Sequence, residues 1–388
     1  MITLKTSLVE DNAALAQWAE HWLQEAAIGI DTEFIRTQTF YPKAGLFQIS
    51  SSQGEVLVDP LKVTDFEPLR RVLADPGVIK VIHAGSEDLE LFQYFLGVLP
   101  QPLFDTQIAA AFAGKGLSVG YQKLVEMELG QQLPASETRS NWLQRPLTES
   151  QIHYASADVH FLLPLYRTLN EQLKAKGMQE PFAETCAELI QDYQEGRDPS
   201  LYFQKLRGAW RLSRGRQRVL QQLCIWREAE ARRRDQPRSH VLPDAVVMEI
   251  AQQQPKTVFE LSKIPGITHR QLKQLGEPIL QVVRQSQTMA ALKPAEAIPK
   301  PLEKERKALF QCLRERVRVI AEQLQVPDSL LIKKRQIEEL ATQVVLHRPL
   351  EQLPISLKGW RAPILNQPLL DEINKFIAEQ SDANPVDL

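Results

Sequence analysis

Asp31 and Glu33 stand two positions apart at the end of an apolar run, Ile28-Gly29-Ile30. Side chains two positions apart on a β-strand point to the same face, so both carboxylates should project together from the end of a core strand. Two neighbouring carboxylates repel each other unless a positive charge or a proton lies between them. The pair therefore predicts a divalent metal ion, an arginine or a shared proton, and Arg36 is a candidate arginine.

Three further acidic residues follow this pair along the chain. Asp88 comes just after a predicted strand, and Asp158 lies on a predicted long helix. Asp105 opens another predicted helix, where we expect it to be the N-cap, with substrate binding as a weaker candidate role. Carboxylates without cysteine and with little histidine favour hard cations such as Mg²⁺ or Mn²⁺. Four carboxylates can hold two such ions about 4 Å apart, which suits hydrolysis of a phosphodiester.

His153 and Tyr154 both precede Asp158 at a spacing that could serve the same site. On a helix, residues four apart are separated by about 40° and residues five apart by about 140°. Tyr154 should therefore share the face of Asp158, and we assign Tyr154 rather than His153 to the site. Because tyrosine has a pKa of about 10, we expect its hydroxyl to orient a water rather than to act as a general base.

Two weaker candidates for substrate binding lie beside these residues. Phe34 follows the acidic pair and could stack on a terminal base, or could simply pack in the core. His83 ends a predicted core strand and could reach the site, although we favour a structural role for it.

Several of these segments resemble the exonuclease motifs of the ribonuclease D family. The segments are Asp31-Thr32-Glu33-Phe34, His83-Ala84-Gly85-Ser86-Glu87-Asp88-Leu89, Phe104-Asp105-Thr106-Gln107, Arg145-Pro146-Leu147-Thr148 and Tyr154-Ala155-Ser156-Ala157-Asp158. The resemblance covers essentially the whole chain. It implies a DEDD-type 3′–5′ exonuclease domain with an RNase H-like fold, followed by two HRDC domains, the helical domains shared by helicases and RNase D.

This resemblance also implies a reaction and the residues that perform it. Asp31, Glu33, Asp88 and Asp158 are expected to bind two divalent metal ions, Mg²⁺ or Mn²⁺, and Tyr154 to orient the attacking water. The implied substrate is RNA with a 3′ end, including tRNA precursors, and the implied products are nucleoside 5′-monophosphates.

The first half of the chain must supply the frame that positions these residues. Predicted strands cover residues 28–31, 45–50, 55–58 and 78–83, and predicted helices cover 11–26, 66–73, 86–96, 105–112, 121–129 and 148–169. Thr148 and Gln151 have the spacing of a capping box at the start of the last helix. Strands come first in succession and then alternate with helices, so we expect an α/β domain with a mixed sheet flanked by helices.

After about residue 200, strand signals nearly vanish and helical periods dominate. A proline-rich linker at 288–302 divides this part into two all-α segments that look weakly alike, which suggests a duplicated module. We therefore expect an exonuclease domain at 1–200 and HRDC-like helical domains at 204–288 and 302–380.

A basic stretch from Lys205 to Arg238 begins the helical half. We expect Arg232, Arg233 and Arg234 to bind RNA phosphates, because arginine contacts phosphate through a planar fork. The alternatives are a solvated helix face or arginines that pair with acidic residues of the nuclease domain.

The bulk composition agrees with an enzyme of the cytoplasm. The net charge is −2, and the three cysteines are scattered without a zinc-binding spacing. Neither a signal peptide nor an apolar run long enough to span a membrane is evident, and no obligate protein partner is indicated. Two other functions remain open from the residues: a 3′–5′ exonuclease acting on DNA, and a catalytically inactive nucleic-acid-binding protein.

Overall fold

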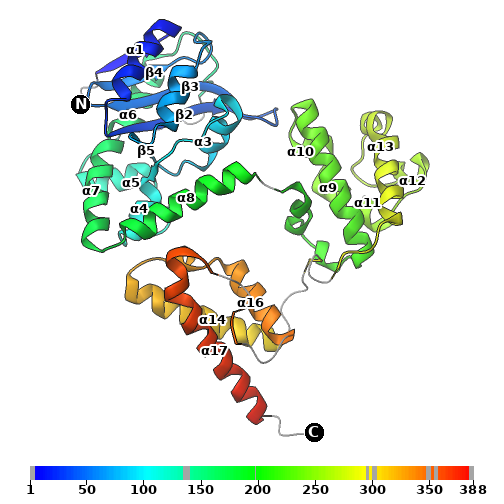
Figure 1. Cartoon of the computed structure of the whole chain (residues 1–388). Helices are drawn as coiled ribbons and strands as arrows, with labels where there is room; N and C mark the ends of the chain where they lie inside the picture. Colours follow the sequence, from blue (N-terminus) through cyan, green and yellow to red (C-terminus); the bar gives the residue numbers. More distant parts are fainter. Residues whose placement is uncertain are drawn as a thin grey trace. The chain divides into compact units, whose positions relative to one another are not determined.

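The computed structural model describes residues 5–133, 140–196, 198–293, 297–298, 304–346, 351–353 and 357–383. Its first part is an α/β domain built on a six-stranded sheet (Figure 1). The strands are β1 (Thr6–Val9), β2 (Ala27–Ile35), β3 (Lys43–Ser51), β4 (Gly54–Val58), β5 (Ile79–Ile82) and β6 (Leu103–Asp105), and they lie in the order β1-β4-β3-β2-β5-β6.

The sheet is mixed, as predicted. The pairs β1–β4, β2–β5 and β5–β6 are parallel, whereas β3 and β4 are antiparallel. The sequence prediction missed β1 and β6, which have only four and three residues and give little periodic signal. Strand β2 lies inside the sheet, and its first four residues are buried, so the strand that carries Asp31 and Glu33 is firmly held.

Helices surround this sheet. They are α1 (Asn12–Trp22), α2 (Glu67–Ala74), α3 (Ser86–Leu91), the π-helical turn η1 (Phe92–Leu96), α4 (Thr106–Phe112), α5 (Tyr121–Leu129), α6 (Glu149–His160), α7 (Leu162–Ala175) and α8 (Gln179–Glu195). Both predicted caps are confirmed. The Asp105 carboxylate accepts from the N–H groups of Gln107 and Ile108, and Thr148 forms a capping box with Gln151.

The helix predicted over 148–169 is wrong as a single element, because it is divided at Phe161 into α6 and α7. The Tyr121 hydroxyl lies between the two groups that a continuous helix would join. It accepts from Phe161 N at 3.1 Å and donates to Ala157 O at 3.3 Å. Pro164, which has no N–H, stands in the first turn of α7. A side chain inserted into the helical ladder is a recognised cause of such a break.

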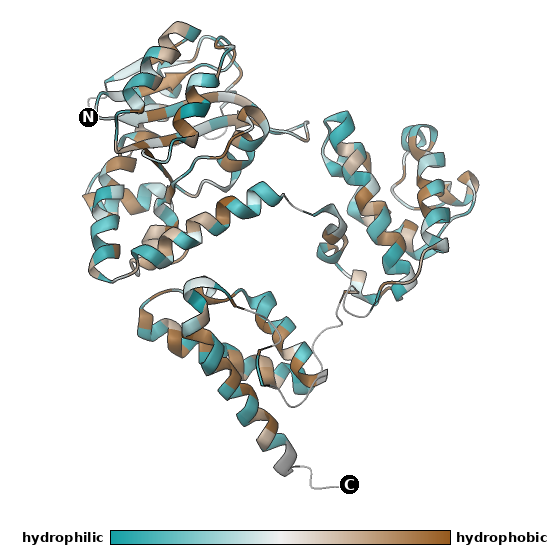
Figure 2. Cartoon of the chain, viewed as in Figure 1, coloured by the Kyte–Doolittle hydropathy of each residue, from teal (hydrophilic) through white to brown (hydrophobic). Residues whose placement is uncertain are grey.

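After residue 196 the described elements are helices. They are η2 (Pro199–Lys205), η3 (Ala209–Arg211), α9 (Arg214–Arg234), α10 (Arg238–Val241), α11 (Asp244–Gln253), α12 (Val258–Ser262), α13 (His269–Thr288), α14 (Lys304–Leu324), α15 (Asp328–Leu331), α16 (Lys334–Leu346), η4 (Gly359–Arg361) and α17 (Ala362–Ala383). Figure 2 shows hydrophobic and hydrophilic residues side by side along them, as expected for helices that bury one face.

The predicted resemblance between the two helical segments is visible in their elements. A helix of 21 residues, then a helix of four residues, then a longer helix occur in this order as α9–α11 and again as α14–α16. The left-handed residues Asp235 and Gln325 follow the two long helices. The prolines Pro294, Pro299 and Pro301 of the predicted linker lie outside the described residues.

The chain divides into two compact units. One comprises Met1–Phe34, Ala44–Gln194 and Leu302–Leu388, and the other comprises Ile35–Lys43 and Glu195–Pro301. The loop that follows β2 thus packs with the first helical segment. In the described part of the chain, no helix is both long and apolar enough to cross a membrane.

Candidate active site

Strand β2 presents the acidic pair at its solvent-accessible end. Asp31 and Glu33 are partly exposed, whereas Thr32 between them is buried. This alternation is the one expected for neighbouring residues on a strand. The Thr32 hydroxyl donates a hydrogen bond to the Asp88 carboxylate, which ties β2 to the start of α3.

Asp88 is buried on the first turns of α3, and Asp105 shapes the loop that leads to it. Besides capping α4, the Asp105 carboxylate accepts from Ala84 N and Gly85 N, each at 3.1 Å. All four of its hydrogen bonds come from backbone N–H groups, so Asp105 fixes the turn between β5 and α3. Its part in substrate binding stays a prediction.

Helix α6 brings Tyr154 and Asp158 to the same place. The Tyr154 side chain forms a hydrogen bond with the Asp158 carboxylate, and both residues are partly buried, whereas His153 is exposed. The expected helical geometry is therefore present: residues four apart meet, and the residue five apart points elsewhere.

All four acidic side chains have raised pKa values, and the charges of the other acids contribute at Asp31 and Glu33. Desolvation raises the pKa of Asp31 well above its usual range, with further contributions from the charges of Asp88, Asp158 and Glu33. Desolvation, followed by the charges of Asp158 and Asp88, raises the pKa of Glu33 to about 9. Each of the four sites thus disfavours its charged form.

The pKa values of Asp88 and Asp158 are also raised, and each carboxylate accepts a side-chain hydrogen bond that opposes the shift. Desolvation raises the pKa of Asp88 to about 6 against the opposing bond from Thr32. It raises the pKa of Asp158 to about 7 against the opposing bond from Tyr154. Neither bond brings a positive charge to the group.

The sequence left open that an arginine neutralises the acidic pair. No arginine of the described residues is among the leading influences on the pKa values of these two carboxyls. The leading influences on Asp31 and Glu33 are burial and other acids, and no lysine or arginine of the described residues figures among them.

The donor chemistry of these four carboxylates fits divalent cations, which relieve such repulsion and prefer oxygen ligands. Within the described ranges, no three acidic, histidine or cysteine side chains are arranged closely enough to coordinate one metal ion together. One Asp88 oxygen is occupied by Thr32.

His83 directly follows β5, and Phe34 directly follows Glu33 on β2. The Thr106 hydroxyl donates to Ile82 O at 3.0 Å, so it can only accept from His83 Nδ1, which lies 2.9 Å away. Desolvation lowers the pKa of His83, which favours the neutral ring. Phe34 is partly buried against the main hydrophobic core. A substrate contact by either residue stays a prediction.

Two residues near the site were missed by the sequence reasoning. Thr32 bonds to Asp88, and Tyr121 braces α6 immediately after Asp158. The charges of Asp158 and Asp31 contribute to a raised pKa of Tyr121, after desolvation as the largest cause. Pro164 was the available signal for the helix break, but nothing in the sequence pointed to Tyr121 as its partner.

The three arginines predicted to bind RNA all have acidic partners on their own helix, α9. Arg232 pairs with Glu228 at 2.9 Å, and Glu230 pairs with Arg233 at 2.7 Å and with Arg234 at 2.5 Å. The Arg232 guanidinium also lies 4.8 Å from the centre of the Phe40 ring. Arg233 is the most exposed of the three, at 67% of its side chain.

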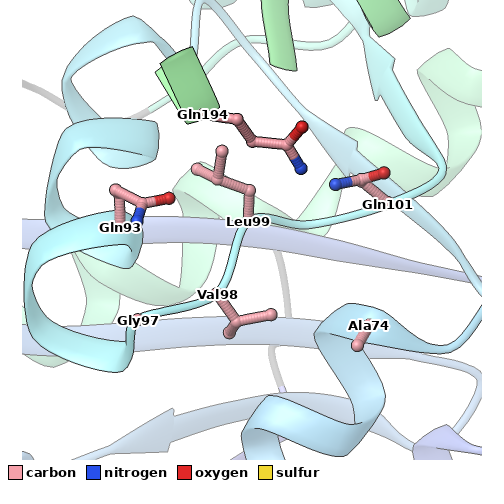
Figure 3. Close-up of a pocket in the computed structure, with 7 residues that line it drawn as sticks. All are labelled: Ala74, Gln93, Gly97, Val98, Leu99, Gln101 and Gln194. Carbon is pink, nitrogen blue, oxygen red and sulfur yellow. The ribbon is translucent and has the colours of Figure 1, made fainter. Parts of the chain in front are cut away.

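A pocket elsewhere in the α/β domain is lined by residues outside the acidic group (Figure 3). The lining residues are Ala74, Gln93, Gly97, Val98, Leu99, Gln101 and Gln194. It offers amides and apolar groups but no carboxylate, so we place the candidate active site at the acidic group on β2, α3 and α6.

Three family models match successive parts of the chain. A 3′-5′ exonuclease family matches residues 6–174, an HRDC domain matches 216–283, and the C-terminal HRDC domain of ribonuclease D matches 305–369. All four acidic residues of the site lie within the first match.

Whole proteins match over nearly their full length. The chain is 40% identical to ribonuclease D of Pseudomonas paraeruginosa, covering 94% of this chain and 96% of that protein. It is 35% identical to ribonuclease D of Escherichia coli, covering 95% and 98%. The crystal structure of E. coli RNase D, described as an exoribonuclease involved in structured RNA processing, aligns with a TM-score of 0.83 at 33% identity, covering 97% of this chain and 99% of that one.

The raised pKa values give a prediction for the metal-free protein. A carboxyl whose pKa is raised by folding stabilises the fold below its unfolded pKa, and this stability is lost as the pH rises through the folded pKa. Glu33→Gln removes one such group, whose folded pKa is about 9. We expect the variant to be more stable than the wild type at pH 8 in EDTA by about 1–2 kcal/mol, since partial exposure screens the repulsion.

The measurement is urea unfolding in EDTA between pH 4.5 and pH 9. The difference between Glu33→Gln and the wild type should grow as the pH rises. Glu20→Gln, at an exposed residue that pairs with Arg71 at 3.3 Å, is the matched control. A pH-independent difference for Glu33→Gln would contradict the electrostatic account.

Proposed function

The chain belongs to the ribonuclease D family, and on that premise we propose that it acts as a divalent-metal-dependent 3′–5′ exoribonuclease that releases nucleoside 5′-monophosphates. The observation that carries the proposal is a group of four carboxyls with raised pKa values, in which the charges of the other acids act on Asp31 and Glu33 and no cationic partner is among the leading influences. An oxygen-rich acidic group of this kind suits two Mg²⁺ or Mn²⁺ ions.

Asp31, Glu33, Asp88 and Asp158 would hold these ions. When bound, two such ions lower the pKa of a water and stabilise charge on the leaving oxygen of a phosphodiester. The residues come from three separate elements, β2, α3 and α6. Thr32 would hold Asp88 in reach of the strand, because its hydroxyl bonds to that carboxylate.

Tyr154 would orient the attacking water. Its hydrogen bond to Asp158 uses the hydroxyl proton, because an ionised carboxylate only accepts, and leaves the oxygen lone pairs to accept from a water. Helix α6 would keep this hydroxyl in place, since its start is fixed by the capping box and its end by Tyr121.

The proposed substrate is RNA with an accessible 3′ end, tRNA precursors included. The E. coli relative is described as acting in structured RNA processing, and two HRDC domains accompany the nuclease domain in this chain. We propose that residues 1–200 perform the cleavage and that the helical domains at 204–288 and 302–380 bind RNA outside the site. Of the three arginines predicted to bind RNA, Arg233 is the best exposed for a phosphate contact.

Removing one carboxylate should abolish cleavage without unfolding the protein. We expect Asp31→Asn to shorten a 5′-labelled single-stranded RNA at least about 100-fold more slowly, since the barrier rises by about 1.4 kcal/mol for each factor of ten. The assay compares matched RNA and DNA with Mg²⁺, with Mn²⁺ and with EDTA, and circular dichroism checks the fold.

The arms of this assay separate the alternatives. Faster shortening of DNA than of RNA would favour a DNA exonuclease. Wild-type protein that binds RNA but shortens neither strand with any metal would be an inactive binding protein. Full activity in EDTA would contradict the role given to the carboxylates.

Substitutions at Tyr154 and at the adjacent His153 test the assignment of Tyr154. We expect Tyr154→Phe to lower kcat about 10- to 100-fold, because it removes only the hydroxyl that bonds to Asp158. His153→Ala should change kcat less than about twofold, since His153 is exposed. The opposite pattern in steady-state kinetics would reverse the assignment.

Replacing Arg233 tests the phosphate contact. In the Asp31→Asn background, Arg233→Gln should reduce the slope of log K against log salt by about 0.7, the value for one phosphate on a single strand. Arg71→Gln, at a similarly exposed arginine paired with Glu20, is the control. Fluorescence anisotropy from 50 to 300 mM salt measures the slope, and an unchanged slope for Arg233→Gln would exclude the contact.

A further inference from the structure

Arg145 and Asp59 form an ion pair that the proposed reaction does not use. Arg145 Nε lies 2.6 Å from Asp59 Oδ2, and Nη2 lies 2.7 Å from Oδ1, so the two groups meet through parallel hydrogen bonds. The Asp59 side chain is only 1% exposed. Bidentate arginine–carboxylate pairs of this kind are strong and fix the relative orientation of the two groups.

The rest of the guanidinium binds backbone rather than side chains. Arg145 Nη1 donates to Trp142 O at 2.9 Å and to Gln144 O at 2.7 Å, and Nη2 also donates to Gly45 O at 2.7 Å. One side chain thus joins the end of β4, the start of β3 and the segment that precedes α6. Lysine could not reproduce this pattern, because it has no planar fork.

Gly45 shows how closely this segment approaches the acidic strand. A Cβ at position 45 would lie 2.7 Å from Trp142 Cβ, 2.9 Å from Trp142 O and 3.1 Å from Glu33 O. Trp142 therefore sits against bare backbone on β3, directly beside the strand that carries Glu33. The Trp142 side chain is almost completely buried, so its position is fixed.

Trp142 in turn contacts the residue proposed to orient the water. The ring centres of Trp142 and Tyr154 are 6.1 Å apart with an angle of 35° between their planes. The Tyr154 hydroxyl bonds to Asp158. A continuous series of contacts thus leads from Asp59 through Arg145 and Trp142 to Tyr154.

We propose that Asp59 and Arg145 are positioning residues for the cleavage reaction: they fix Trp142, which holds the Tyr154 ring so that its hydroxyl stays at Asp158. This inference rests on the proposed role of Tyr154. A group that must be held to within a fraction of an ångström is sensitive to such support, and a misplacement of about 1 Å can cost about 100-fold in rate.

A double-mutant cycle distinguishes positioning from general structural support. The cycle measures kcat and KM on a short single-stranded RNA for the wild type, Arg145→Lys, Tyr154→Phe and the double variant. If Arg145 acts through Tyr154, Arg145→Lys should lower kcat about tenfold in the wild type with KM nearly unchanged. In the Tyr154→Phe background it should lower kcat less than about twofold.

Arg70→Lys is the matched control in the same domain. Arg70 of α2 donates to Leu96 O at 2.7 Å and pairs with Glu67, so it joins α2 to the end of η1, but it makes no contact with Tyr154 among the described residues. Its kcat should stay within twofold of the wild type.

Each outcome of the cycle decides the inference. Equal losses of kcat from Arg145→Lys in both backgrounds, or a folded Arg145→Lys enzyme with full activity, would overturn it. Full activity of Tyr154→Phe would instead overturn the proposed role of Tyr154. Should Arg145→Lys not fold, Trp142→Phe keeps the ion pair but shrinks the ring beside Tyr154, and it is expected to show the same dependence on the Tyr154 hydroxyl.

Discussion

The burial of four carboxyls in one site, Asp31, Glu33, Asp88 and Asp158, is the constraint on which the candidate site depends. Each of these carboxyls has a raised pKa, with desolvation as the first cause, and at Asp31 and Glu33 the other acids add to it. A fold gains nothing in stability from such an arrangement, since the folded state must either hold extra protons or keep like charges together. The arrangement is explained if the site binds cations, which neutralise the carboxylates.

The surrounding structure consists largely of devices that keep these acids in place. The strand β2 is held inside the mixed sheet. Asp105 binds four backbone N–H groups and so fixes the turn before Asp88. Tyr121 ends α6 just beyond Asp158 by bridging Phe161 N and Ala157 O. The ion pair of Asp59 and Arg145 holds Trp142, whose ring lies beside Tyr154 of α6. Rigid support of this kind is what a reaction that depends on position requires.

Local patterns in the sequence predicted the elements better than their contacts. The alternation at Asp31 and Glu33, the caps at Asp105 and Thr148 and the shared face of Tyr154 and Asp158 follow from backbone geometry within a few residues, and the structure has all of them. The family resemblance added the grouping of four acids from distant segments, which periodicity alone could not supply.

The features that the sequence did not predict depend on partners far along the chain or on side-chain geometry. Tyr121 ends a helix that begins at Glu149, 28 positions further along the chain. Asp59, directly after β4, pairs with Arg145 in the segment before α6. Glu228 and Glu230 stand three or four positions before the arginines of α9, a spacing visible in the sequence. Which glutamate pairs with which arginine follows only from the side-chain positions.

Counting bound ions and released protons together tests the central claim most directly. The metal-free protein is titrated with Mn²⁺ at pH 7 in weak buffer, with bound ions measured by electron paramagnetic resonance and protons by a pH-stat. Because the pKa of Glu33 is raised to about 9 and that of Asp158 to about 7, the account predicts two bound ions and the release of at least one proton per chain. No Mn²⁺ bound at millimolar concentration, or binding without proton release, would contradict it.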